Sequence, residues 1–300
     1  MTLYSNNSGK LILLNEKPFK LEKDMQKLFE NNLSPLMGLE LVRSEFSIKN
    51  KRIDTLAYDP QTNAFIIIEY KRDKNISVVD QGFTYLSLML ENKSDFIVEY
   101  NESLNKSLKR DHVDWSQTRV AFVSQSFTEN QIQATNFKDI AIELWEITQY
   151  ENNTVAINKI KKSTSAESIK PITKQNQGLK QVIDEIKVYS EEDHLENASD
   201  LTAELYEKFK NAILNLADGI EVVPTKTYIA FKKGSNISDI EIQKKSLKIS
   251  INMKSGLLDD PKKLTQDVSN IGHRTNGDYR IQIADDKNLE YIMSLIKQVL

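Results

Sequence analysis

The segment 52–71, RIDTLAYDPQTNAFIIIEYK, consists of two strand-like runs separated by a turn. Residues 52–58 and 64–71 are rich in β-branched and aromatic side chains, which favours strands. Between them, DPQTN at 59–63 contains the Asp, Pro and Asn residues typical of a hairpin turn. The second run is apolar on both faces until Glu69, so we expect this strand at the centre of its sheet.

The segments on either side of this hairpin predict a mixed α/β domain. Leu21, Met25, Leu28 and Phe29 share one face of a helix expected at 21–31. Further elements are expected as a strand at 40–48, a helix at 78–90, a strand at 119–124, a helix at 129–138, a strand at 141–147 and an edge strand at 152–160. The order α-β-β-β-α-β-α-β is typical of a mixed sheet flanked by helices.

The second half of the chain predicts a separate, smaller α+β domain. Residues 161–178 are polar and lack apolar periodicity, which indicates a linker that extends to about 189. After it, a helix is expected at 201–216, strands at 227–231, 237–243, 247–253 and 279–283, and a closing helix at 289–300. We therefore expect a first domain at 1–160, a linker at 161–189 and a second domain at 190–300.

The composition excludes several classes of protein. Of the 300 residues, 39% are hydrophobic and 28% are charged, as in an ordinary soluble protein. Cysteine is absent, which excludes disulfides, zinc ribbons and thiol nucleophiles. The three histidines lack zincin spacing, and no phosphate-binding P-loop or G-x-S-x-G elbow occurs. No apolar run reaches the about 18 residues that cross a bilayer, and no signal peptide pattern opens the chain. We expect a cytoplasmic protein without a membrane partner.

A group of acidic and basic side chains lies around the end of the central strand. Glu69 and Lys71 are two residues apart, so both emerge on one face, and the hairpin brings Asp54 close to Glu69. Two neighbouring carboxylates remain ionised at little cost when a cation lies between them, and oxygen ligands suit Mg²⁺ or Mn²⁺. The carbonyl of Tyr70 is a further expected ligand. Lys71 is expected to orient a metal-bound water and to stabilise charge on a phosphate.

A structural interpretation of the same residues stays open at this point. Aspartate is common in hairpin strands, and a Glu-x-Lys pair is more often an ion pair on a solvated face. The apolar run before Glu69 favours a chemical role, because a charged pair at the end of a buried strand requires partners.

The motif RID-(x)14-EYK resembles the PD-(D/E)XK nuclease superfamily, with Ile53 at the position of the proline. Gln81 and Tyr85, four residues apart on the next expected helix, resemble the Q-x-x-x-Y motif of its RecB-like branch. The run RSEFSIKNKRIDTLAYDPQTNAFIIIEYKRDKN is similar to domains related to the archaeal mismatch and flap nucleases. The resemblance covers roughly 20–155. It implies a restriction-endonuclease-like mixed-sheet core and Mg²⁺-dependent hydrolysis of DNA, in repair or phage defence, with four catalytic residues: Asp54, Glu69, Lys71 and Gln81.

The first helix of that superfamily often supplies a glutamate to the acidic cluster. Here the expected helix at 21–31 contains Glu22 and Glu30. Glu22 is the preferred metal ligand because Met25 and Phe29 place it beside the apolar face, whereas Glu30 is expected to point toward solvent. The alternative is that both glutamates belong to a solvated helix face.

Basic residues around the motif predict contacts with a nucleic acid. Arg52, Arg72 and Lys74 are placed to bind backbone phosphates, which would give an affinity that depends on salt and not on sequence. The resemblance assigns Tyr85 to the same substrate-binding group. The alternative is a solvated charged face balanced by nearby acidic residues. DNA is the expected partner, RNA is left open, and the sequence is compatible with a homodimer.

The sequence after residue 190 resembles an uncharacterised domain that often follows such nuclease-like domains in bacteria. Proteins with this pairing have been labelled predicted transport proteins, although no segment here could cross a membrane. Two interpretations therefore accompany the nuclease: a non-catalytic protein that retains the fold and binds a nucleic acid or a partner, and a transport-associated component supported by that label alone.

Overall fold

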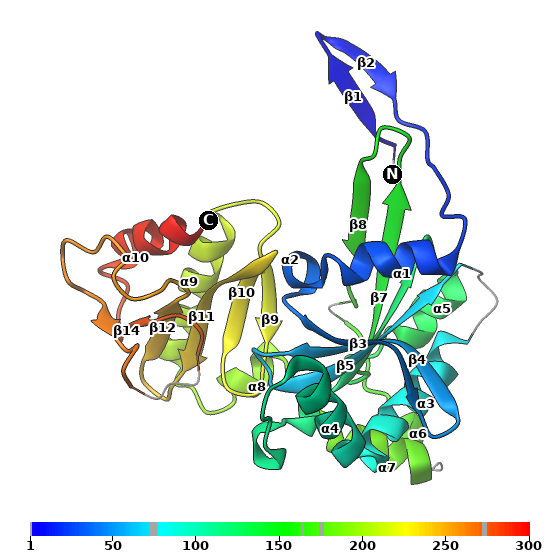
Figure 1. Ribbon diagram of the computed structural model, residues 1–300. Helices are drawn as coiled ribbons and strands as arrows, with labels where there is room; N and C mark the ends of the chain where they lie inside the picture. Colours follow the sequence, from blue (N-terminus) through cyan, green and yellow to red (C-terminus); the bar gives the residue numbers. More distant parts are fainter. Residues whose placement is uncertain (1, 73–76, 164, 174–176, 272–274) are drawn as a thin grey trace. The chain divides into compact units, whose positions relative to one another are not determined.

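The computed structural model describes residues 2–72, 77–163, 165–173, 177–271 and 275–300. The chain forms two compact units, each with its own hydrophobic core (Figure 1). The first unit contains Met1–Ser34 and Leu39–Val188, and the second contains Pro35–Gly38 and Tyr189–Leu300. In the described part of the chain, no helix is both long and apolar enough to cross a membrane.

The first unit is built on a mixed six-stranded sheet. In sheet order its strands are β3 (Glu40–Ile48), β4 (Lys51–Asp59), β5 (Ala64–Lys71), β6 (Arg119–Ser124), β7 (Ile142–Gln149) and β8 (Val155–Lys159). Neighbours from β3 to β5 are antiparallel, β5 to β7 are parallel, and β8 returns antiparallel to β7. Every residue of β5 except Lys71 is buried, which confirms the central position expected for this strand.

Helices cover both faces of this sheet. On one face, α1 (Glu22–Glu30) packs its Phe29 edge-on against Tyr70 of β5, with ring centroids 6.0 Å apart. On the other face, Phe65 of β5 contacts Phe96 of α4 at 5.9 Å. The first unit also contains α3 (Val78–Glu91), α4 (Lys93–Leu104), η1 (Arg110–His112), η2 (Trp115–Gln117) and α5 (Glu129–Thr135). The short helix α2 (Leu33–Met37) begins in the first unit, and its residues from Pro35 on are grouped with the second. The alternation of side chains along β5 therefore separates the α1 contacts from the α4 contacts.

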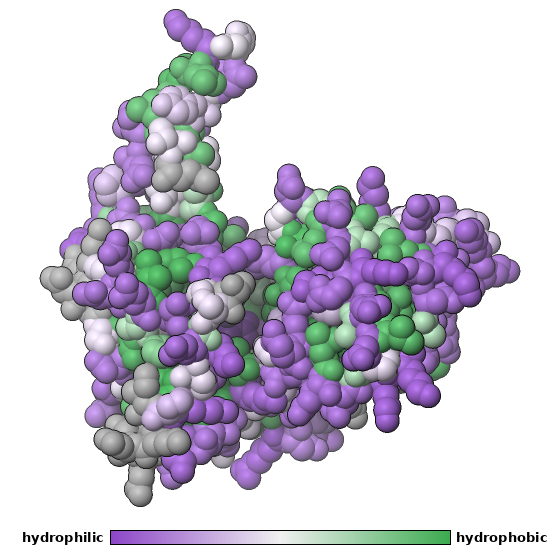
Figure 2. Space-filling model, turned by 180° about the vertical axis from the view of Figure 1, so that it is seen from behind, coloured by the Kyte–Doolittle hydropathy of each residue, from purple (hydrophilic) through white to green (hydrophobic). Residues whose placement is uncertain are grey.

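A short hairpin precedes α1 and was not expected from the sequence. Within the described residues, strands β1 (Tyr4–Asn7) and β2 (Lys10–Leu13) pair only with each other. An isolated bridge from Glu16 to Tyr150 connects the following chain to the end of β7. Figure 2 shows patches of hydrophobic surface on this hairpin, where Leu11, Ile12 and Leu13 are exposed.

Residues 161–188 correct the expected linker at 161–189. They belong to the first unit and include two helices, α6 (Lys170–Thr173) and α7 (Gln177–Glu185). Ile169, Val182, Ile183 and Ile186 are buried in the core of that unit. These four side chains form a narrow apolar face among polar residues, and that face packs on the core of the first unit.

The second unit is the smaller α+β fold that the sequence predicted. Its antiparallel sheet has, in order, β13 (Gln266–Asp267), β14 (Tyr279–Ile283), β12 (Leu247–Ile251), β11 (Ser235–Ile242), β10 (Ile229–Lys233) and β9 (Glu221–Pro224). Its helices are α8 (Glu191–Leu195), α9 (Asp200–Leu214), α10 (Leu289–Ile296) and η3 (Lys297–Val299). Phe209 of α9 and Phe231 of β10 lie in its core. The predicted fold class is confirmed in its architecture: a mixed-sheet α/β core is followed by a smaller α+β domain.

Candidate active site

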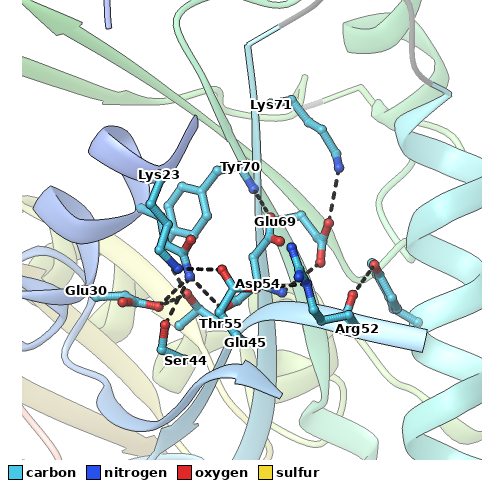
Figure 3. Close-up of polar contacts among 12 residues, drawn as sticks. Lys23, Glu30, Ser44, Glu45, Arg52, Asp54, Thr55, Glu69, Tyr70 and Lys71 are labelled. Carbon is cyan, nitrogen blue, oxygen red and sulfur yellow. Dashed lines mark hydrogen bonds and ion pairs between the residues drawn. The ribbon is translucent and has the colours of Figure 1, made fainter. Parts of the chain in front are cut away.

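Asp54 on β4 and Glu69 on β5 are held together by the backbone of their two strands. The amide N–H of Asp54 donates to Glu69 Oε1 at 3.2 Å, and the amide N–H of Tyr70 donates to Asp54 Oδ2 at 3.1 Å (Figure 3). Each carboxylate thus accepts from the strand that bears the other. Glu69 is 2% exposed and Asp54 is half-buried, so these hydrogen bonds hold two carboxylates next to each other on adjacent strands.

Two cationic or polar donors converge on the same oxygen of Glu69. Lys71 Nζ lies 3.1 Å from Glu69 Oε2, and Gln81 Nε2 of α3 donates to that oxygen at 3.1 Å. Gln81 Nε2 also lies 3.2 Å from the hydroxyl of Tyr85. The structure therefore brings together the four residues for which a catalytic role is predicted. The ion pair is not on a solvated face, because the Lys71 side chain is 15% exposed and that of Glu69 is 3% exposed.

The negative charges of Asp54 and Glu69 are only partly compensated by the groups around them. Burial raises the pKa of Glu69, and the charge of Asp54 raises it further, while Lys71 opposes the shift. Burial also raises the pKa of Asp54, against the hydrogen bond from the Tyr70 amide and the charge of Lys71. Both carboxylates are therefore less easily ionised than usual, and a cation between them would favour the ionised pair.

The two glutamates of α1 differ from the expectation in part. Glu22 is exposed and accepts from the Arg72 amide at 2.7 Å, and its charge raises the pKa of Asp54. Glu30 was expected to point toward solvent. It is instead half-buried, and its carboxylate accepts hydrogen bonds from Gln26 Nε2 and from the hydroxyl of Thr55. The reason is that residues four apart share one helix face, and the face of Gln26 and Glu30 is turned toward β4.

The predicted substrate-binding residues occupy different environments. The Arg52 side chain is 70% exposed beside the acidic pair, and Arg72 Nη1 donates to the Lys20 carbonyl at 3.1 Å. Tyr85 is only 5% exposed, and its hydroxyl donates to the Arg52 carbonyl at 3.4 Å. The Tyr85 hydroxyl also accepts from Gln81 Nε2 and so helps to hold that side chain, while its expected contact with a substrate stays a prediction. Lys74 lies outside the described residues.

Gln26 belongs to the site and was not identified from the sequence. Its side chain is 3% exposed, and Nε2 lies 2.7 Å from the Asp54 carbonyl and 2.9 Å from Glu30 Oε1. It thereby joins α1 to the strand that carries Asp54. The signal in the sequence is the spacing of Glu22, Gln26 and Glu30, which forms a polar row beside the apolar row of the same helix.

The donor set fits a hard divalent cation that keeps several of its waters. Among the described residues, no group of three or more His, Asp or Glu side chains could hold a metal ion by itself. Mg²⁺, however, is often bound through one or two carboxylates, with water completing its shell. Gln81 Oε1 is buried beside the pair and accepts no hydrogen bond within the described structure. An acceptor without a donor next to two destabilised carboxylates is the environment that a hydrated cation would satisfy.

Comparisons with known proteins place the whole chain in a family. A protein of Haemophilus influenzae, named only as an uncharacterized protein, is 57% identical over 300 residues, which cover 100% of this chain and 99% of that protein. The chain belongs to the family of this protein. Residues 191–298, within the second unit, match a domain of unknown function, DUF5655.

Three solved structures show partial likeness to the chain. The EndoMS–dsDNA2 complex is 16% identical, covering 44% of this chain and 48% of that chain, with a TM-score of 0.30. A repair endonuclease from Pyrococcus abyssi is 18% identical, covering 43% and 48%, with a TM-score of 0.25. Pyrococcus furiosus SfsA in complex with Ca²⁺ is 14% identical, covering 54% and 77%, with a TM-score of 0.26. The chain thus spans about half the length of the first two. Likenesses of this size carry no inference about activity.

Proposed function

We propose that the first unit is a Mg²⁺-dependent or Mn²⁺-dependent phosphodiesterase that hydrolyses DNA, in repair or in phage defence. The observation that supports this most strongly is the buried pair of Asp54 and Glu69, with Lys71 and Gln81 both on one oxygen of Glu69. Binding alone does not require two destabilised carboxylates beside a lysine. A metal-dependent hydrolase requires both the acidic pair and a nearby cationic group.

Asp54 and Glu69 would hold the cation, with the Tyr70 carbonyl and Glu22 as further candidate ligands. When bound, the cation would lower the pKa of a coordinated water and stabilise negative charge on the phosphate. The contribution of the chain is positioning, since the reciprocal amide hydrogen bonds fix both carboxylates on adjacent strands. Lys71 and Gln81 would orient the attacking water or a phosphate oxygen beside Glu69. Arg52 and Arg72 would bind the backbone on either side.

A second candidate function is a non-catalytic protein that binds a nucleic acid through the same surface. Two observations favour it. Lys71 already forms an ion pair with Glu69, and the described residues contain no acidic cluster of three that could hold a metal. A protein of this kind would bind DNA with or without divalent cation, and it would leave the DNA intact.

Cleavage assays distinguish the two functions. Purified protein is incubated with linear duplex, single-stranded and flap DNA in the presence of Mg²⁺, Mn²⁺ or EDTA. The phosphodiesterase predicts products with either cation and none in EDTA, and it predicts their loss in Glu69→Ala. Binding without cleavage under every condition would reject the enzyme and leave the binding protein. Cleavage that Glu69→Ala retains would show that the activity lies elsewhere or comes from a contaminant.

A further inference from the structure

Glu45 on β3 has an unusual backbone and an unusual position. Its φ is 56°, in the left-handed region that non-glycine residues rarely adopt. The pairs Ser44–Thr55 and Phe46–Ile53 enclose it in the register of β3 with β4, so Glu45 lies across from Asp54. Like charges directly opposite on neighbouring strands are unfavourable. A third carboxylate beside the acidic pair therefore requires a reason.

Two cations from different elements converge on this carboxylate. Lys23 Nζ of α1 lies 2.6 Å from Glu45 Oε1, and Arg52 Nε of β4 lies 2.8 Å from Glu45 Oε2 (Figure 3). The Lys23 side chain is 44% exposed and that of Arg52 is 70% exposed, whereas that of Glu45 is 28% exposed. The two cations thus reach the surface with a single carboxylate between them.

The contact between Glu45 and Arg52 is incomplete. Although Arg52 Nε is within ion-pair distance, Glu45 Oε2 is buried and accepts no hydrogen bond in the described structure. The planar guanidinium of arginine carries five N–H donors and matches phosphate oxygens in pairs. A phosphodiester has the same charge as a carboxylate and likewise presents two anionic oxygens. It could therefore take the place of Glu45 as the acceptor for both cations.

We propose that Lys23 and Arg52 form a clamp for one backbone phosphate of the DNA, and that Glu45 occupies the clamp until the substrate displaces it. This inference rests on the proposed function and assigns the phosphate to the side of Asp54 that faces β3. The charge of Glu45 also raises the pKa of Asp54, which agrees with a location beside the acidic pair. The hydrogen bond from Lys23 lowers the pKa of Glu45, so this carboxylate stays ionised in the absence of DNA.

The clamp makes Glu45 a competitor of the substrate, so its neutralisation should strengthen binding. We expect Glu45→Gln to bind a short DNA duplex about fivefold more tightly than the parent, because the phosphate no longer displaces a charged group. Glu45→Asn serves as a second variant, because asparagine adopts the left-handed conformation at lower cost. Binding is measured by fluorescence anisotropy in EDTA at several salt concentrations, after thermal unfolding shows that each variant is folded.

A matched control separates the clamp from a general change of charge. Glu99 of α4 forms an ion pair at 3.6 Å with Arg43, which lies on β3 like Glu45. Glu99→Gln changes the net charge of the protein by the same amount as Glu45→Gln. This control should bind like the parent. Adding Lys23→Met or Arg52→Met to Glu45→Gln should abolish the gain, since the gain requires both cations.

The outcomes separate this inference from the proposed function. If the parent binds and cleaves DNA but Glu45→Gln binds no more tightly, the clamp is wrong and the enzyme stands. An equal gain in Glu99→Gln also rejects the clamp. If neither the parent nor Glu45→Gln binds DNA in EDTA, the clamp is wrong, and the cleavage assay with Mg²⁺ or Mn²⁺ decides the proposed function.

Discussion

Asp54 illustrates how one side chain links the stability of the sheet to its chemistry. Its carboxylate accepts from the Tyr70 amide, its own amide donates to Glu69, and its carbonyl accepts from Gln26. The residue is therefore well fixed, yet its charge is poorly compensated. Fixed geometry with uncompensated charge is common at functional sites, where stability is lower than it could be.

Asp54→Asn should stabilise the protein in the absence of divalent cation. Because burial raises the pKa of Asp54, the parent is most stable at low pH and loses stability as pH rises through the raised pKa, so the gain from asparagine is greatest at high pH and disappears at low pH. The asparagine oxygen can still accept from the Tyr70 amide, so we expect a gain in the free energy of unfolding at pH 7 and a flatter pH dependence. Urea unfolding in EDTA from pH 5 to pH 8 measures both.

The control for this substitution is Asp111→Asn, which makes the same charge change at an exposed residue of η1. It should leave the unfolding midpoint unchanged. If Asp54→Asn were no more stable than the parent at pH 7, the acidic pair would not be electrostatically strained, and the case for a cation between the carboxylates would be lost.

At the scale of elements, α3 positions two site residues because it lies very close to β7. A Cβ built on Gly82 would come within 2.4 Å of Ile142 Cδ1 and 2.9 Å of Ile142 Cγ1. Only glycine therefore permits this approach of the helix, and the neighbouring Gln81 reaches Glu69 as a result. Helix packing, and not helix propensity, determines the residue at this position.

Gly82→Ala should destabilise the first unit although alanine favours helices. The overpacking cost of roughly 1–3 kcal/mol exceeds the propensity gain of about 1 kcal/mol. Cleavage should fall as well, since α3 carries Gln81. Adding Ile142→Val removes the Cδ1 atom and should restore part of both losses. Urea midpoints and cleavage rates of the single and double variants test this, and a Gly82→Ala protein more stable than the parent would contradict the close packing.

The hairpin of β4 and β5 could be predicted from the sequence because its information is local. The turn at 59–63 sets the pairing, and the apolar run before Glu69 requires a central strand. The juxtaposition of Asp54, Glu69 and Lys71 then follows from strand geometry within a single hairpin. The place of Gln81 in the site could be predicted only from the resemblance to the nuclease superfamily, because the distance from Gln81 to Glu69 depends on how α3 packs.

Features that depend on tertiary packing could not be predicted from the sequence. The environments of Gln26 and Glu30 depend on which face of α1 lies against β4. Helical spacing alone does not determine this rotation of the helix about its axis. Glu45 adopts a left-handed conformation that its residue type does not indicate. The sequence predicts a linker where α7 forms, because the apolar face of this helix, with Val182 and Ile183, is short and lies among polar residues.

At the scale of the molecule, each of the two units has its own core and should unfold with its own transition. Both tryptophans, Trp115 and Trp145, lie in the first unit. Tryptophan fluorescence therefore reports that unit alone, whereas circular dichroism reports both. The difference between the two signals follows the second unit.

The second unit should lose stability as pH rises, because of Asp239. This residue is fully buried, and burial raises its pKa to about 6 despite hydrogen bonds from Asn236 and Asn276. The folded unit therefore binds the proton more tightly than the unfolded chain, and roughly 2–3 kcal/mol should be lost between pH 4 and pH 7. Asp239→Asn should remove this dependence from the dichroism transition and leave that of the fluorescence transition. Loss of the dependence from both signals would show that the units unfold together.

The central claim is that Asp54, Glu69 and Lys71 form the active site of a metal-dependent DNA hydrolase. Lys71→Ala tests it most directly when cleavage rate and DNA affinity are measured on the same samples. Lysine stabilises charge mainly in the transition state, so the rate should fall on the order of a hundredfold or more while the affinity changes by no more than about threefold.

The control is Lys106→Ala, which removes a lysine of equal charge from an ion pair with Glu40 outside the acidic site. Its rate and affinity should both match those of the parent. A Lys71→Ala protein that cleaves DNA at the parent's rate, or one whose affinity falls as far as its rate, would contradict the assignment.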